Sequence, residues 1–322
     1  MGDKRSRSFY VLAAFFAAYV LFLYGPMIAI YILSFQGPDG GLTFPMNGVS
    51  LVWFSKVFAG AGIVDIGAAF KRSLKLGLVV MVLTVVLSVS AGMAFRKSFR
   101  GATFLFYVAI ASLIMPSIIT SLGIALEFRL LDDFIIKSGA EGWTTAMGLF
   151  TSGLGAHLTW TLPFGILIMF AIFNRFDGRL EEAARDLGAT PWQTFRHVVL
   201  PIILPSVVGI GLFGFTLSWD ELARSSQAIG SVNTLPLELQ GLTTTVTKPD
   251  IYALGTLTSA VSFLVIFSAL IVILVLQARQ RRHGSDAREW CRISRWRTFQ
   301  HSARQSATRI SCGGRSRSRA AP

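Results

Sequence analysis

The chain has 322 residues, of which 52% are hydrophobic and 15% are charged, and its mean hydropathy is +0.58. This composition excludes an ordinary soluble domain and indicates a membrane protein. The formal net charge of +13 does not indicate nucleic-acid binding, because the twelve arginines and two acids of residues 277–322 account for most of it.

Apolar stretches alternate with polar segments from the N-terminus onward. A basic segment, 1–8, precedes an apolar run that is too long for the apolar part of a signal peptide, so we expect a retained first span. Gly and Pro are frequent in 36–72, which carries Trp53, Phe54 and Phe58 and indicates an external loop lying partly on the membrane surface. We predict an all-α polytopic membrane protein with six transmembrane helices, over residues 9–35, 73–95, 102–126, 149–173, 205–222 and 252–276.

Positive charge gathers in four of the segments that connect or flank these spans. Residues 1–8, 96–101, 174–200 and the tail hold 22 of the 30 Lys and Arg residues. Cytoplasmic loops of membrane proteins carry such an excess. Both termini and the loop 174–204 are therefore predicted to face the cytoplasm.

Several residues inside or beside the spans are expected to be architectural. Pro116 and Pro163 would kink their helices. Small residues at 209, 211 and 214 would allow close helix approach. His157 has no partner at metal-ligand spacing.

The tail, residues 283–322, is rich in Arg, Ser and Gly and has no apolar periodicity. It is predicted to be disordered. Its arginines could bind anionic membrane lipid, although we favour a solvated extension without a role. The two cysteines, Cys291 and Cys312, lie there without partners, so no metal site is predicted.

The most distinctive polar stretch is residues 181–201, EEAARDLGATPWQTFRHVVLP. Gly188 is placed to end a first helix and Thr190-Pro191 to cap and start a second one. The prediction is helix, sharp corner, helix. Short helices are marginal in water, so the corner must pack against something, through an apolar face that comprises Leu180, Ala183, Ala184 and Leu187.

This stretch resembles the signature loop of ABC importer permeases. The family pattern is Glu-Ala-Ala, three residues, Gly, nine residues and Ile-x-Leu-Pro. Here Glu182-Ala183-Ala184 is followed by Gly188 and by Val198-x-Leu200-Pro201 at those distances, and Val198 is the only departure. Six spans with cytoplasmic termini also match the type I permease fold of that family.

The resemblance implies that 174–204 holds a coupling helix that docks on a cytoplasmic ABC ATPase dimer. The ATPase-coupling residues would be Glu182, Ala183, Ala184, Asp186, Gly188 and Pro201. The alternative is a solvated loop whose internal compensation is a Glu181–Arg185 pair. No P-loop sequence occurs in the chain, so the chain is not expected to be an enzyme or to bind a cofactor, and ATP would be used by the partner.

Further partners follow from the same resemblance. They are a second, related permease subunit in a heterodimer and a periplasmic solute-binding protein, at the bacterial inner membrane. An ATP-independent secondary transporter is the competing class. It would predict inverted repeats, and the first three spans share no pattern with the last three.

The segments 215–227 and 234–239 resemble the spermidine/putrescine branch of these permeases. Asp220 and Glu221 follow an apolar span beside Trp219, and carboxylates with an aromatic face suit polyamine ammonium groups. These three residues are the candidate substrate-pathway residues. Alternatively, the acids cap the outer end of the span and pair with Arg224. Amino acids, iron, sulfate and thiamine use the same architecture and remain alternative solutes.

Overall fold

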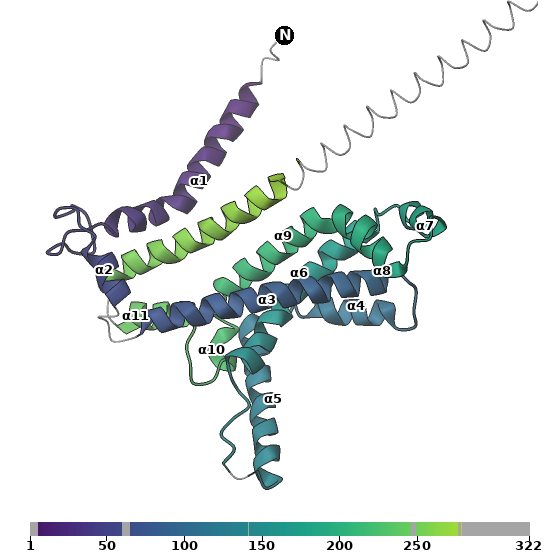
Figure 1. The fold of residues 1–322 in the computed structure, drawn as a ribbon. Helices are drawn as coiled ribbons and strands as arrows, with labels where there is room; N and C mark the ends of the chain where they lie inside the picture. Colours follow the sequence, from purple (N-terminus) through teal and green to yellow (C-terminus); the bar gives the residue numbers. More distant parts are fainter. Residues whose placement is uncertain (1–5, 60–64, 141, 246–248, 276–277, 279–322) are drawn as a thin grey trace, which may run out of the picture. The chain divides into compact units, whose positions relative to one another are not determined.

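The computed structural model describes residues 6–59, 65–140, 142–245, 249–275 and 278. Regular structure in these ranges is helical, apart from one isolated β-bridge between Gln36 and Val49. The helices, labelled as in Figure 1, are α1 (Arg7–Leu33), α2 (Val52–Ala59), α3 (Ile66–Phe95), α4 (Ala102–Ala111), α5 (Ser117–Lys137), η1 (Leu149–Gly153), α6 (Leu154–Phe173), α7 (Arg179–Asp186), α8 (Pro191–Thr194), η2 (Phe195–Val199), α9 (Leu200–Trp219), α10 (Ser225–Ala228), α11 (Leu235–Thr245) and an unlabelled helix, Asp250–Val275.

The chain divides into two compact units, Met1–Ala269 and Leu270–Pro322. The first unit contains every labelled helix. The described residues of the second are 270–275, which end the last helix, and 278. The expected tail over 283–322 lies outside the described residues.

Five helical stretches of the described residues are long and apolar enough to cross a membrane: Arg7–Leu33, Ile66–Phe95, Leu149–Phe173, Pro191–Trp219 and Asp250–Val275. The predicted all-helical polytopic class is confirmed. Two stretches begin at least seven residues earlier than expected. The α3 helix starts at Ile66, where the Asp65 carboxylate accepts the Ala68 N–H at 2.9 Å, and the α8–η2–α9 stretch starts at Pro191.

The expected continuous span over 102–126 is wrong. The structure has two helices there, α4 and α5, separated by residues 112–116. Proline lacks an N–H and disfavours helical geometry in the residue before it. At Pro116 this ends the helix instead of kinking it, whereas α6 continues through Pro163.

The centre of the first unit is formed by α3, α6 and α9, each of which packs against the other two (Figure 1). A Cβ on Gly165 of α6 would lie 2.0 Å from Ser88 Oγ on α3, so these two backbones approach closely. Thr84 and Thr161 share a buried hydrogen bond of 2.8 Å across the same contact. The expected close approach also holds at Gly214, where a Cβ would lie 3.2 Å from Thr84 Cβ, but a Cβ on Gly209 would meet no atom within 4 Å.

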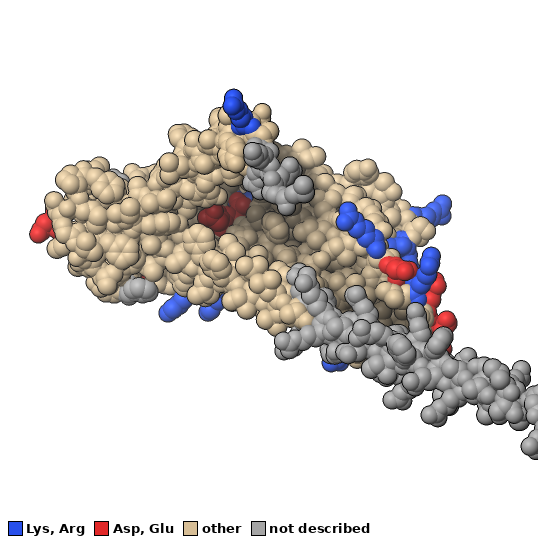
Figure 2. Space-filling view, turned by 90° about the horizontal axis from the view of Figure 1, so that it is seen from above, with Lys and Arg blue, Asp and Glu red and all other residues tan. Residues whose placement is uncertain are grey.

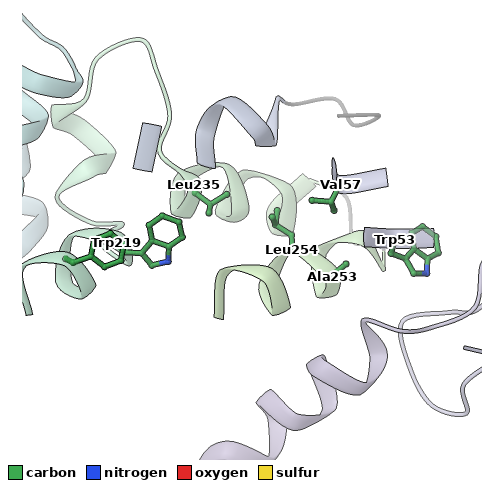
Figure 3. Packing of buried hydrophobic residues seen from close by; sticks show 7 residues of the cluster. Trp53, Val57, Trp219, Leu235, Ala253 and Leu254 are labelled. Carbon is green, nitrogen blue, oxygen red and sulfur yellow. The ribbon is translucent and has the colours of Figure 1, made fainter. Parts of the chain in front are cut away.

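A hydrophobic cluster joins α2, the end of α9, α11 and the start of the last helix (Figure 3). Partly buried residues at the start of α3 pack against it. Trp53 of α2 is one of its members and is 8% exposed, and its Nε1 donates to the Gln36 carbonyl at 2.9 Å. Trp53 therefore belongs to the core of this cluster, whereas the sequence suggested a surface residue. The side chain of Phe58 lies outside the described residues.

The segment after α5 is tied to that helix by Asp132. Its carboxylate accepts hydrogen bonds from Thr145 Oγ1 at 2.6 Å, Trp143 Nε1 at 2.9 Å and the Ala146 N–H at 2.6 Å. These donors, Thr145 foremost, lower the pKa of the Asp132 carboxyl. The ionised side chain thus orders the turn between α5 and η1.

Candidate functional site

The first half of the polar stretch folds as α7 and ends at Gly188, which has a φ of +83°. The Gly188 N–H donates to the Arg185 carbonyl at 2.8 Å, and the Ala189 N–H donates to the Ala184 carbonyl at 3.0 Å. This pair of bonds is a Schellman motif, which satisfies the last carbonyls of a helix and needs a left-handed residue. The sequence prediction of a glycine stop is confirmed.

The second half begins with a capping box. Thr190 Oγ1 accepts the Gln193 N–H at 3.3 Å, and Gln193 Oε1 accepts the Thr190 N–H at 2.8 Å. Pro191 occupies the first helical position, where its missing N–H costs nothing. The helix then continues through the wide turn η2 into α9, so the corner is continuous with a membrane-spanning helix.

Most of the expected coupling residues lie together on this corner. Glu182, Ala183, Asp186 and Gly188 are exposed and Ala184 is half-buried. Pro201 lies beyond η2, in the first turn of α9, and is not part of the corner.

The described residues of the first unit leave most of the apolar face of the corner uncovered. Leu187 is 89% exposed, Leu180 47% and Trp192 66%. Lys, Arg, Asp and Glu gather at one end of the molecule in Figure 2, the end that carries α7 and α8 in Figure 1, while most of the remaining visible surface is uncharged. Large apolar side chains thus stand among charged ones.

Glu181 does not make the expected pair with Arg185. Its Oε1 accepts a hydrogen bond from Arg96 Nη1 at 2.6 Å, and Arg96 is the residue that caps the C-terminus of α3. The guanidinium also lies 5.0 Å from the ring centres of Phe173 and Phe176. Arg96 was not singled out from the sequence, because nothing there distinguishes it from Lys97 and Arg100.

The second group of candidate residues lies at the end of α9. Trp219 is 4% exposed, stacks on Phe215 with ring centres 5.7 Å apart, and forms a T-shaped pair with Phe70 with ring centres 5.4 Å apart. The Trp219 ring is therefore buried in the hydrophobic cluster. Trp219 does not present the open aromatic face that the sequence suggested.

The neighbouring acids differ in their surroundings. Asp220 is exposed, while Glu221 is half-buried and its Oε1 accepts the Arg224 main-chain N–H at 2.8 Å. The alternative expectation of an acid pairing with the Arg224 side chain is not met, since the ion pairs found among the described residues do not include Arg224.

The Arg224 side chain is fully buried, which the sequence did not indicate. The guanidinium donates to Thr159 Oγ1 and to the Ser112 carbonyl, and it lies 5.0 Å from the Trp160 ring centre. Ser112 caps the C-terminus of α4, where a positive charge is favourable. Arg224 thus supplies a hydrogen-bond donor at the interruption between α4 and α5.

His157 takes part in the same polar core. Its ring nitrogens lie 2.8 Å from Ser218 Oγ and 2.9 Å from Ser225 Oγ. These bonds connect α6 to Ser218 near the end of α9 and to Ser225 at the start of α10. His157 is architectural, as expected.

The corner and the residues at the end of α9 both lie within a segment that matches one known protein family. Residues 84–285 match the family described as "binding-protein-dependent transport system inner membrane component". The chain belongs to this family. It is therefore a multi-pass permease of the bacterial inner membrane, and the Glu-Ala-Ala loop is consistent with that membership.

Curated relatives of the permease resemble it over most of their length. The spermidine/putrescine transport system permease protein PotC of Haemophilus influenzae is 30% identical over 276 residues, which are 85% of this chain and 99% of that protein. PotC of Shigella flexneri is 26% identical over 276 residues, 85% of this chain and 97% of that one. The putrescine transport system permease protein PotI of Escherichia coli is 30% identical over 239 residues, 73% of this chain and 81% of that one.

Solved structures with the same fold include a bacterial ABC transporter involved in the import of alginate. It has a TM-score of 0.58 at 15% identity and covers 85% of this chain and 94% of that one. The MetNI methionine ABC transporter has a TM-score of 0.50 at 17% identity and covers 64% and 93%. At these identities the likeness shows the type I permease fold alone.

Proposed function

We propose that this permease forms part of the translocation pathway for polyamine uptake, powered by a cytoplasmic ABC ATPase dimer that docks on α7. The polyamine part rests on relatives named for spermidine and putrescine transport that align with most of the chain. The permease itself binds no cofactor and hydrolyses no ATP in this proposal. The ATP is used by the partner.

The observation that carries the coupling part is the uncovered apolar face of a rigid corner. Leu187 and Trp192 are exposed although both ends of the corner are fixed by main-chain and capping hydrogen bonds. A fixed apolar surface rimmed by charge is typical of a protein interface. Glu182 and Asp186, one helical turn apart, repel each other on a free helix, so a basic surface on the ATPase would stabilise the docked state.

Two more partners complete the proposed importer. A related permease subunit would pair with this one, and a periplasmic solute-binding protein would deliver the polyamine. A structural neighbour of the same fold, the alginate ABC transporter, was solved in complex with its alginate-loaded periplasmic protein. The mechanism is alternating access: ATP binding closes the ATPase dimer, α7 moves with it, and the spans open toward the periplasm.

For the solute, the proposed contacts are Asp220 and Glu221. An exposed carboxylate at the end of a span can attract an ammonium group directly, and a second carboxylate beside it adds to the field. Trp219 acts through packing, because its ring contacts Phe215 and Phe70.

The test is uptake of labelled spermidine and putrescine by the assembled importer in proteoliposomes. The double variant Asp220→Asn/Glu221→Gln should lower uptake while leaving ATPase association unchanged, since the amide oxygen of a glutamine can still accept the Arg224 N–H. The matched control is Asp133→Asn, an exposed acid on α5. Unaltered uptake in the double variant would rule out these carboxylates as pathway residues. If the wild-type importer takes up neither spermidine nor putrescine, polyamines are ruled out as the solute class.

A further inference from the structure

The helix α7 is tied to α3 by one short ion pair. Arg96 and Glu181 are 85 positions apart in the chain, and their charged atoms are 2.6 Å apart. Their side chains are 21% and 13% exposed. Partial burial reduces solvent screening, so such a pair holds its partners more firmly than an exposed pair does.

Arg96 is held from several directions. The rings of Phe173, at the end of α6, and Phe176, in the connection to α7, each lie 5.0 Å from its guanidinium carbon. Met93 Sδ lies 3.7 Å from Nη1. A guanidinium stacked on aromatic faces loses little further freedom when it forms an ion pair, so the contact with Glu181 is pre-organised.

The same loop offers a contrast. Arg179 and Asp177 also form an ion pair, but it is 3.9 Å long, its side chains are 89% and 60% exposed, and its residues are two positions apart. Such a surface pair contributes little to stability and links no separate elements. The Arg179–Asp177 pair can therefore serve as the control for the Arg96–Glu181 pair.

The helix that Arg96 caps, α3, contacts the central helices of the bundle, so a displacement of α3 would move them as well. α3 packs against both α6 and α9, shares the buried Thr84–Thr161 hydrogen bond with α6, and approaches α9 closely at Gly214. A displacement of its cytoplasmic end would therefore reach the centre of the bundle. A close-packed contact of this kind transmits displacement because it deforms little.

We propose that the Arg96–Glu181 pair is the transmission link that couples displacement of α7 to α3. The inference rests on the proposed docking of an ATPase at α7 and adds a positioning residue, Arg96, that lies outside the signature loop. Without the pair, α7 would remain attached to the spans through its chain connections and its contacts with α8 and η2. The ATPase could then still move α7, but α3 would follow only indirectly, through its packing against α9.

The experiment compares hydrogen exchange in the assembled importer with and without ATP–vanadate trapping. In the wild type we expect a nucleotide-dependent change both in α7 and in the last two turns of α3. In Arg96→Gln and Glu181→Gln the change in α7 should persist, and the change in α3 should fall by up to about fivefold, the factor that corresponds to an ion pair of about 1 kcal/mol. The exchanged pair Arg96→Glu/Glu181→Arg should restore part of it, because the charges pair again but a glutamate at position 96 cannot stack on Phe173 and Phe176.

The control variants are Asp177→Asn and Arg179→Gln, which should leave both signals unchanged. Arg96→Lys keeps the charge and should retain part of the α3 signal, which guards against misfolding of the Gln variant. An undiminished α3 signal in both single variants, or failure of the exchanged pair to restore any of it, would overturn the link. Absence of any nucleotide-dependent change in α7 of the wild type would instead overturn the proposed docking.

Discussion

Replacing Gly188 by Ala should destabilise the corner by a predictable amount. A Cβ at this position would meet no atom within 4 Å, so the cost is purely conformational. An L-residue other than glycine in the left-handed region costs roughly 1–2 kcal/mol, which corresponds to a factor of about 5–30 in the population of the folded corner. Asn tolerates this region and should cost less.

The matched control is Gly178→Ala, at the other end of α7. Gly178 has a φ of −62° and no atom within 4 Å of an added Cβ. Alanine there should be neutral or stabilise by about 0.4–1 kcal/mol, because it restricts the unfolded chain. Hydrogen exchange of residues 187–190 measures the corner in the permease alone, and the apparent Kd for the ATPase measures docking.

The expected order of corner protection is Gly178→Ala at or above wild type, then Gly188→Asn, then Gly188→Ala. The apparent Kd should weaken in the same order if docking requires the formed corner. Equal protection in Gly188→Ala and Gly178→Ala would refute the reasoning that backbone geometry at position 188 fixes the turn. Equal loss in Gly188→Asn and Gly188→Ala would refute it as well, since only the second should carry the full cost.

Two further predictions follow from single contacts. Gly165→Ala should lower the stability of the bundle by about 1–3 kcal/mol, because the added Cβ would lie 2.8 Å from Ser88 Cβ and even closer to the Ser88 hydroxyl. Thermal unfolding in detergent measures this loss. Gly211→Ala is the control and should be tolerated, since its nearest neighbour would lie 3.4 Å from the added Cβ. The lowered pKa of Asp132 means that its contribution to stability is present above the unfolded-state pKa of about 3.9 and is lost as pH falls through the lower folded-state value. Exchange protection of residues 143–146, corrected for intrinsic rates, should therefore drop in acid, and a pH-independent profile identical to that of Asp132→Asn would contradict this.

The sequence predicted those parts of the molecule that depend on local chemistry. Apolar length located most of the spans, and Gly188 with Thr190-Pro191 located the corner, because a left-handed stop and a capped start are properties of neighbouring residues. The break after α4 was only half predicted. Pro116 signalled a bend, but a full interruption also needs partners for the freed carbonyls, and the partner of the Ser112 carbonyl is Arg224, 112 positions away.

Contacts between distant segments could not be predicted. Arg96 lies in a short basic loop with two similar cations, and only the fold brings it to Glu181. Trp53 and Trp219 carried the pattern of interfacial or solute-facing aromatics, yet both became members of one buried cluster. In each case the side chain allowed several roles, and the packing of non-adjacent helices chose among them.

At the Gly188 corner, the atoms that fix the backbone turn are different from the side chains exposed on its surface. Its turn is closed by main-chain atoms of residues 184, 185, 188 and 189, while Leu187, the most exposed of its apolar side chains at 89%, takes no side-chain part in that closure. Position 187 can therefore change identity without altering the fold of the turn. A permease built this way can be adapted to a different docking surface one exposed residue at a time.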